Sequence, residues 1–244
     1  DVLDKSMTRR GKDTVQIQFA KDYERVNELL LQNPSFIDDM GNAVAISLGY
    51  VGLYLAYEKV VGAYGDNPDF CRLLREYDDV MLKCIQGGMS DMLMPFFERY
   101  HFLDKKDPYL ASNEKSVLDI GYLKTASYTT IGPTVMGMII NGTDEDKLDK
   151  MRSIMSHAGI AFQVQDDILG VFADPKVLGK DVGSDVSEFK QTLLYVYIKE
   201  HDKVRYKELM KYYGNPDITA SDMKRVCELF TESGAYKYAT DMMN

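Results

Sequence analysis

Residues 162–170 read Phe-Gln-Val-Gln-Asp-Asp-Ile-Leu-Gly, which places two adjacent acids inside an apolar stretch. The surrounding apolar side chains recur with helical spacing and predict a helix over residues 144–171. Burying two neighbouring carboxylates is costly unless a metal ion or hydrogen-bond donors neutralise them. The pair Asp166 and Asp167 therefore indicates a charged functional site on a helix more than an ordinary solvated helix face.

Helical periodicity extends through most of the chain. Turn signals such as Asn33-Pro34-Ser35 separate the periodic segments, because proline lacks an amide donor and restricts the residue before it. We find no convincing strand pair and no fixed repeat. The chain is therefore predicted to be all-α and one domain over residues 1–244, with helices at 19–31, 41–61, 68–100, 112–140, 144–171, 187–213 and 221–243.

Charge and cysteine content exclude several classes of protein. The 244 residues carry 29 Lys and Arg against 38 Asp and Glu, a balance opposite to that of a nucleic-acid binder. The three cysteines form no paired spacing, so we expect neither a disulfide framework nor a zinc site, and a reducing, cytoplasmic location. The apolar segment 43–57 is expected to be a buried helix rather than a transmembrane segment. Because the sequence opens on Asp1 without an initiator Met, we expect a fragment or a processed form.

A second acidic segment lies at the start of the chain. Residues 1–12 read Asp-Val-Leu-Asp-Lys-Ser-Met-Thr-Arg-Arg-Gly-Lys, so acids are followed by basic residues, as they are after Asp167. Oxygen ligands without His or Cys favour a hard cation, and Mg²⁺ typically takes one or two carboxylates plus substrate phosphates. A diphosphate would be suited to the basic side chains of Arg9, Arg10, Lys124, Lys180 and Lys190.

These motifs resemble those of the trans-isoprenyl diphosphate synthases, the polyprenyl synthetase family that makes farnesyl and geranylgeranyl diphosphates. Residues 1–11 resemble the first motif of the family, D-D-x-x-D followed by R-R-G, with its leading Asp missing. Residues 162–170 are similar to its second motif in a D-D-x-x-G form. Three basic elements of the family stand in order at Lys124-Thr125, Gly179-Lys180 and Lys190-Gln191-Thr192.

The resemblance implies a fold, a cofactor and a set of site residues. The fold would be an isoprenoid synthase-type helical bundle around a central diphosphate and magnesium site, here without its N-terminal helices and its C-terminal end. The implied Mg²⁺ ligands are Asp1, Asp4, Asp166 and Asp167, and the implied catalytic residues are Asp166, Asp167 and Lys124. Arg10 would bind isopentenyl diphosphate, and the allylic diphosphate would be held by Arg9, Lys124, Thr125, Gln163, Lys180 and Lys190.

The implied reaction joins isopentenyl diphosphate to an allylic diphosphate, which can be dimethylallyl, geranyl or farnesyl diphosphate. It proceeds by Mg²⁺-assisted ionisation, head-to-tail alkylation and proton loss, and gives a short-chain product such as farnesyl or geranylgeranyl diphosphate. The resemblance also implies a homodimer. The apolar helix at 41–61 supports this expectation, because it is apolar on nearly every side.

The sequence also departs from the family pattern. Gly88 stands where a Gln is expected in the element that ends at Asp91, Tyr50 replaces an expected Asp, and the connection 12–40 is longer than usual. Two alternatives therefore stay open. One is a non-catalytic regulatory partner subunit of such a synthase. The other is a class I terpene cyclase, although the N-D-x-x-S-x-x-x-E motif of that class is absent from residues 162–170.

Overall fold

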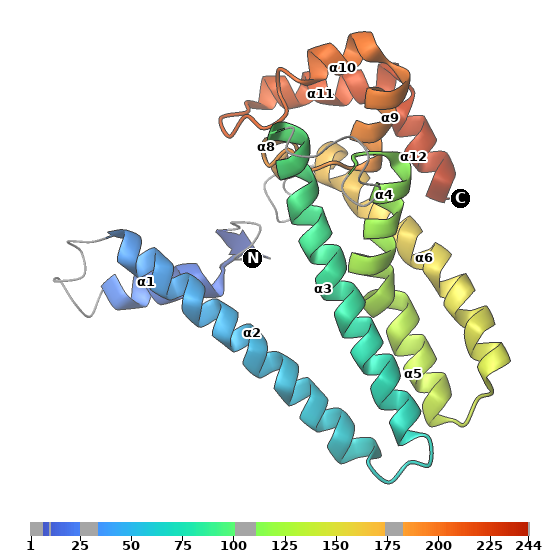
Figure 1. Cartoon of the computed structure of the whole chain (residues 1–244). Coiled ribbons are helices and arrows are strands. Elements are labelled where there is room, and N and C mark those ends of the chain that lie inside the picture. Colours follow the sequence, from blue (N-terminus) through green and yellow to red (C-terminus); the bar gives the residue numbers. More distant parts are fainter. Residues whose placement is uncertain (1–6, 10, 25–33, 101–110, 174–182, 244) are drawn as a thin grey trace. The chain divides into compact units, whose positions relative to one another are not determined.

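The computed structural model describes residues 7–9, 11–24, 34–100, 111–173 and 183–243. The chain divides into two compact units, residues 1–67 and residues 68–244 (Figure 1). Both are built almost entirely from helices, which confirms the predicted all-α class.

The first unit contains a small hairpin and two helices. Strand β1 (Thr8–Arg9) pairs antiparallel with β2 (Lys12–Asp13), and Gly11 in the turn has a φ of +72°. The expectation of no strand pair is therefore wrong at this one place, where the pair is too short to give a periodic pattern. Helix α1 (Val15–Glu24) packs on α2 (Pro34–Tyr64). The predicted helix 19–31 thus begins earlier, and residues 25–33 lie outside the described part.

Helix α2 was expected to be buried, and within its own unit it is not. Its apolar side chains are largely exposed, including Tyr50 at 62% and Tyr54 at 71%. Apolarity predicts that a helix needs a covering surface, but it does not say that the same unit supplies one. By length and composition alone, Asp39–Tyr64 is the one described helix that could cross a membrane, and none of its apolar window is buried.

The second unit is built on three long helical segments that lie side by side (Figure 1). They are α3 (Phe70–Tyr100), the consecutive α4 (Glu114–Ile120), η2 (Gly121–Ile131) and α5 (Gly132–Ile140), and α6 (Glu145–Phe172). The predicted helices at 68–100 and 144–171 are confirmed. The predicted helix at 112–140 contains a π-helical stretch, η2, in its middle. Such stretches are rare and frequently mark functional sites.

Short helices complete this unit and contribute many of its buried apolar side chains. They are α8 (Ser184–Ser187), α9 (Leu193–His201), α10 (Lys203–Leu209), α11 (Ala220–Glu232) and α12 (Ala235–Met243). The prediction of one helix over 187–213 is wrong. The chain leaves helical geometry at Phe189, whose φ is +64°, and Thr192 and Asp202 cap the helices that follow. The predicted helix 221–243 is likewise divided, at Gly234 with a φ of +84°.

Candidate functional site

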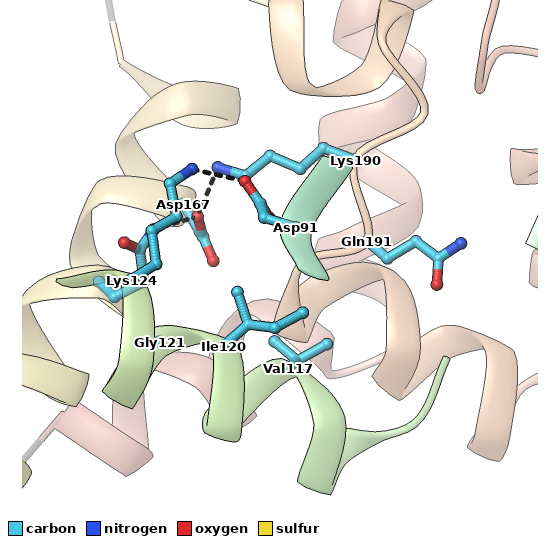
Figure 2. Close-up of a pocket in the computed structure, with 9 residues that line it drawn as sticks. Asp91, Val117, Ile120, Gly121, Lys124, Asp167, Lys190 and Gln191 are labelled. Atoms are coloured by element: carbon cyan, nitrogen blue, oxygen red, sulfur yellow. Dashed lines mark hydrogen bonds and ion pairs between the residues drawn. The ribbon is translucent and has the colours of Figure 1, made fainter. Parts of the chain in front are cut away.

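A pocket in the second unit brings together side chains from α3, the α4–η2 segment, α6 and the turn before α9 (Figure 2). Polar side chains line one part of it and apolar side chains of α4 line another. The lining residues are Asp91, Val117, Ile120, Gly121, Lys124, Gln163, Asp167, Lys190 and Gln191. The pocket therefore combines charged groups with an apolar wall, as ligand sites commonly do.

Lys124 enters the pocket from η2 and meets Asp91 of α3. The ammonium nitrogen lies 2.5 Å from Asp91 Oδ2. The two helices approach closely at this point because Gly87, one turn before Asp91, has no side chain. A Cβ atom on Gly87 would lie 2.3 Å from the backbone nitrogen of Lys124. Close helix packing thus places this lysine.

A chain of hydrogen bonds links η2 to α6. The Thr125 hydroxyl donates to the side-chain oxygen of Gln163. The amide nitrogen of Gln163 donates in turn to Asp167 Oδ1 at 2.8 Å. Gln163 and Asp167 are four residues apart, so they share one face of α6. These bonds fix the orientation of the buried carboxylate.

Lys190 balances the charge of Asp167. Its Nζ lies 3.1 Å from Asp167 Oδ1 and 3.5 Å from Asp185 Oδ1. Burial raises the pKa of Asp167, which is 4% exposed, to about 6, although the Lys190 ammonium opposes this rise. Burial alone would lower the pKa of Lys190, but the carboxylates of Asp167, Asp185 and Asp91 raise it well above its usual range. At neutral pH both partners are therefore charged.

Asp166 faces a different direction from Asp167, because neighbours on a helix point about 100° apart. Its side chain is exposed. The chain therefore buries one acid of the pair and leaves the other at the surface. Four residues beyond Asp166, at Gly170, a Cβ atom would lie 2.7 Å from Asp185 Oδ2. The Asp185 carboxylate thus occupies the space beside the glycine of the D-D-x-x-G segment.

The acidic side chains near the pocket suit a cation that binds together with a substrate. They suit less well a cation held by protein ligands alone. Within the described ranges, no group of three His, Cys, Asp or Glu side chains is arranged to hold a metal ion. Asp166 offers an exposed carboxylate on α6, one of the helices that line the pocket. Mg²⁺ usually keeps several waters and takes one or two carboxylates plus substrate phosphates, so the residues present fit this ion.

The residues predicted from the sequence have three different outcomes. The structure gathers five of them at or beside the pocket, namely Lys124, Thr125, Gln163, Asp167 and Lys190. Asp166 lies exposed on α6, next to Asp167. Arg9 lies on β1 of the other unit. Four of the predicted residues lie outside the described part of the chain, namely Asp1, Asp4, Arg10 and Lys180. The functional roles of all the predicted residues, inside and outside the described part, stay predictions.

Three polar residues at or beside the pocket were not among the predicted ones. Asp91 pairs with Lys124, Asp185 pairs with Lys190, and Gln191 lines the pocket with both side-chain amide atoms buried and without a hydrogen bond. A signal existed for Asp91, which ends an element already noted for its glycines, and for Asp185, which lies between two basic motifs. For neither residue can the lysine partner be inferred from the sequence, because the fold brings the two together.

Comparison with known proteins gives a consistent result. The family model described as polyprenyl synthetase matches residues 1–230. The chain is 27% identical over 237 residues to the short chain isoprenyl diphosphate synthase of Methanocaldococcus jannaschii, covering 97% of this chain and 62% of that protein. It is 27% identical over 239 residues to the geranylfarnesyl diphosphate synthase of Aeropyrum pernix, covering 98% of this chain and 64% of that protein. The chain thus spans less than two thirds of the length of these relatives.

Solved structures agree on the fold. The geranylgeranyl pyrophosphate synthase of Corynebacterium glutamicum, solved with isoprenyl diphosphate and magnesium, matches with a TM-score of 0.83 and 24% identity. This match covers 100% of the present chain and 64% of that one. Because the family model extends over both acidic segments and all three basic elements, the chain belongs to the polyprenyl synthetase family.

Proposed function

We propose that the protein is a Mg²⁺-dependent prenyltransferase that condenses isopentenyl diphosphate with an allylic diphosphate. One observation carries the proposal, namely that Lys124 and Lys190 enter one pocket from different elements, as Figure 2 shows. Paired ammonium groups suit the several oxygens of a diphosphate. The apolar wall of Val117 and Ile120 suits a hydrocarbon chain beside it.

The charges around these lysines favour a substrate that brings cations. Two ammonium groups face three carboxylates, those of Asp91, Asp167 and Asp185. This arrangement has no excess positive charge for a bare diphosphate. Mg²⁺ would neutralise the negative charge that develops on the departing diphosphate.

The individual roles follow from position and chemistry. Asp166 would hold Mg²⁺, together with Asp1, Asp4 and Asp167 as the sequence motifs imply. The ammonium groups of Lys124 and Lys190 would donate to diphosphate oxygens. Thr125 and Gln163 would fix the carboxylate against which Lys190 is held. Arg9 and Lys180 would add contacts to the allylic diphosphate, and Arg10 would bind isopentenyl diphosphate.

The reaction breaks the carbon–oxygen bond of the allylic diphosphate and releases inorganic diphosphate. The electron pair of the isopentenyl double bond then forms the new carbon–carbon bond. A proton leaves the adjacent carbon, with the released diphosphate as its acceptor, and a new double bond forms. The lysines stabilise the leaving group through preorganised hydrogen bonds, which is a major electrostatic contribution in enzymes.

We also propose a cytoplasmic homodimer. The apolar side chains exposed on α2 within its unit support an assembly, since burying them needs a neighbour. The three cysteines are free in the structure, in keeping with a reducing compartment.

An elongation assay tests the proposed function. The chain is incubated with Mg²⁺, isopentenyl diphosphate and each of the three allylic diphosphates, and products are sized by chromatography. We expect a farnesyl or geranylgeranyl product that Asp166→Ala abolishes. Asp78→Ala is the matched control, because Asp78 is likewise an exposed acid of an adjacent acid pair, Asp78-Asp79 on α3, and lies away from the pocket lining. No product with any starter would contradict the proposal and favour a regulatory subunit, and a cyclic hydrocarbon would favour a cyclase.

A further inference from the structure

We propose that Phe189 is a positioning residue that directs Lys190 into the pocket through a left-handed backbone conformation held in place by a buried ring. This inference rests on the proposed function, because it concerns the lysine assigned there to the diphosphate. Phe189 immediately precedes Lys190 and is not itself part of the pocket. Its effect on a ligand would therefore pass through the lysine.

The backbone of Phe189 is unusual. Its φ is +64°, and it is the one residue other than glycine with a positive φ in the described part of the chain. Bulky side chains avoid this region because the Cβ atom crowds the backbone. Such conformations persist only where the surroundings hold them, and they gather at functional sites.

The surroundings of the ring supply that restraint. Phe189 is 5% exposed, and its ring centroid lies 5.9 Å from each of the rings of Tyr195 and Tyr213 in edge-to-face arrangements. Gly214 permits this packing, because a Cβ atom there would lie 3.2 Å from Phe189 Cδ2. Burial of the ring therefore stabilises the strained turn.

The turn determines where Lys190 points. The Lys190 amide donates to the Asp185 carbonyl at 2.8 Å, which closes the chain back on itself just before α9. From this position its ammonium group reaches Asp167 and Asp185. An ordinary negative φ at position 189 would turn the following backbone in another direction. The positive φ of Phe189 thus sets the direction in which the Lys190 side chain points.

Substitutions at position 189 separate backbone conformation from packing. Phe189→Ala removes the ring and keeps the Cβ atom that clashes with the backbone at positive φ. Phe189→Gly removes both the ring and this clash. Phe189→Asn introduces a second residue type that tolerates positive φ. Phe230→Leu is the packing control, since Phe230 is fully buried in the same aromatic cluster, 6.4 Å from Tyr213, and does not adjoin the lysine. Each variant of the full chain is titrated with inorganic diphosphate and Mg²⁺ by calorimetry.

We expect Phe189→Ala to weaken diphosphate binding on the order of tenfold, the effect of losing one charge-assisted hydrogen bond. Phe189→Gly and Phe189→Asn should regain most of that loss, although Gly removes even more packing than Ala. In a Lys190→Met background the difference between Ala and Gly at position 189 should vanish.

Two results would overturn the inference. One is a Gly variant that binds diphosphate no better than the Ala variant, which would reduce the role of Phe189 to packing. The other is a difference between Gly and Ala that persists without Lys190. If the unaltered chain itself binds no diphosphate with Mg²⁺, the proposed function fails first, and the inference fails with it.

Discussion

Two neighbouring glycines of α3 provide a sharp test of how the pocket is built. Gly87 lies against η2, where an added Cβ atom would meet the Lys124 nitrogen at 2.3 Å and the Leu123 carbonyl carbon at 2.7 Å. Gly88 has nothing within 4 Å of the same added atom. The substitutions Gly87→Ala and Gly88→Ala are chemically identical and one residue apart, so their difference isolates the helix contact.

The magnitudes follow from two opposing effects. Replacing glycine by alanine inside a helix stabilises it by about 1 kcal/mol. Overpacking typically costs about 1–3 kcal/mol, and at Gly87 the opposing atoms belong to backbone that cannot rotate away, so we take the upper end. Gly87→Ala should therefore destabilise the protein by about 2 kcal/mol, while Gly88→Ala stabilises it by up to about 1 kcal/mol.

Thermal unfolding measures this difference. In a chain of this size 1 kcal/mol shifts the Tm by about 2–4 °C, so the two variants should differ by roughly 6–12 °C. Gly87→Ala should also weaken binding of Mg²⁺ and inorganic diphosphate, because it displaces Lys124 from Asp91. Equal melting temperatures for the two variants would show that α3 does not pack this closely on η2.

Three further predictions concern α6 and the metal. Gly159→Ala should destabilise the protein by about 1–3 kcal/mol in denaturant unfolding, because the new Cβ atom on α6 would lie 2.4 Å from that of Ala126 on η2. An unchanged free energy of unfolding would show that α6 and η2 are farther apart. Hydrogen bonds from the Lys147 side chain and backbone amide lower the pKa of Asp144, which caps α6. Its ionised form therefore contributes stability above about pH 4 that is lost as the pH falls through the lowered pKa. Asp144→Asn keeps an acceptor oxygen that does not titrate, so the Tm of this variant should fall less steeply between pH 5 and about pH 3 than that of the unaltered chain. Parallel curves of Tm against pH would argue against a stabilising role of the ionised Asp144 cap. Chelation by EDTA should abolish elongation and leave the far-ultraviolet circular dichroism unchanged, with recovery on adding Mg²⁺; elongation that persists would remove Mg²⁺ from the proposal.

Long periodic helices were the part of the fold open to prediction. α3 and α6 follow the expected ranges closely, because their apolar stripes repeat over many turns. The interruptions were not predictable from periodicity. η2 has an apolar pattern that a regular helix would also fit, and the break at Phe189 depends on tertiary packing that holds a bulky residue at positive φ.

The candidate site shows a similar division. Lys124, Gln163 and Lys190 were identified because family motifs are recognised from short runs of sequence. The pocket brings these residues together. Their partners Asp91 and Asp185 were not assigned. Asp91 lies 33 residues from Lys124, and no local rule relates positions so far apart until helices pack.

A structure of the chain with Mg²⁺ and inorganic diphosphate would show whether this pocket holds the diphosphate. We expect diphosphate oxygens in contact with the ammonium groups of Lys124 and Lys190, and a metal ion that joins the diphosphate to the Asp166 carboxylate. A diphosphate bound elsewhere on the protein, with Lys124 still paired with Asp91 and Lys190 with Asp167, would show that this pocket is not the diphosphate site.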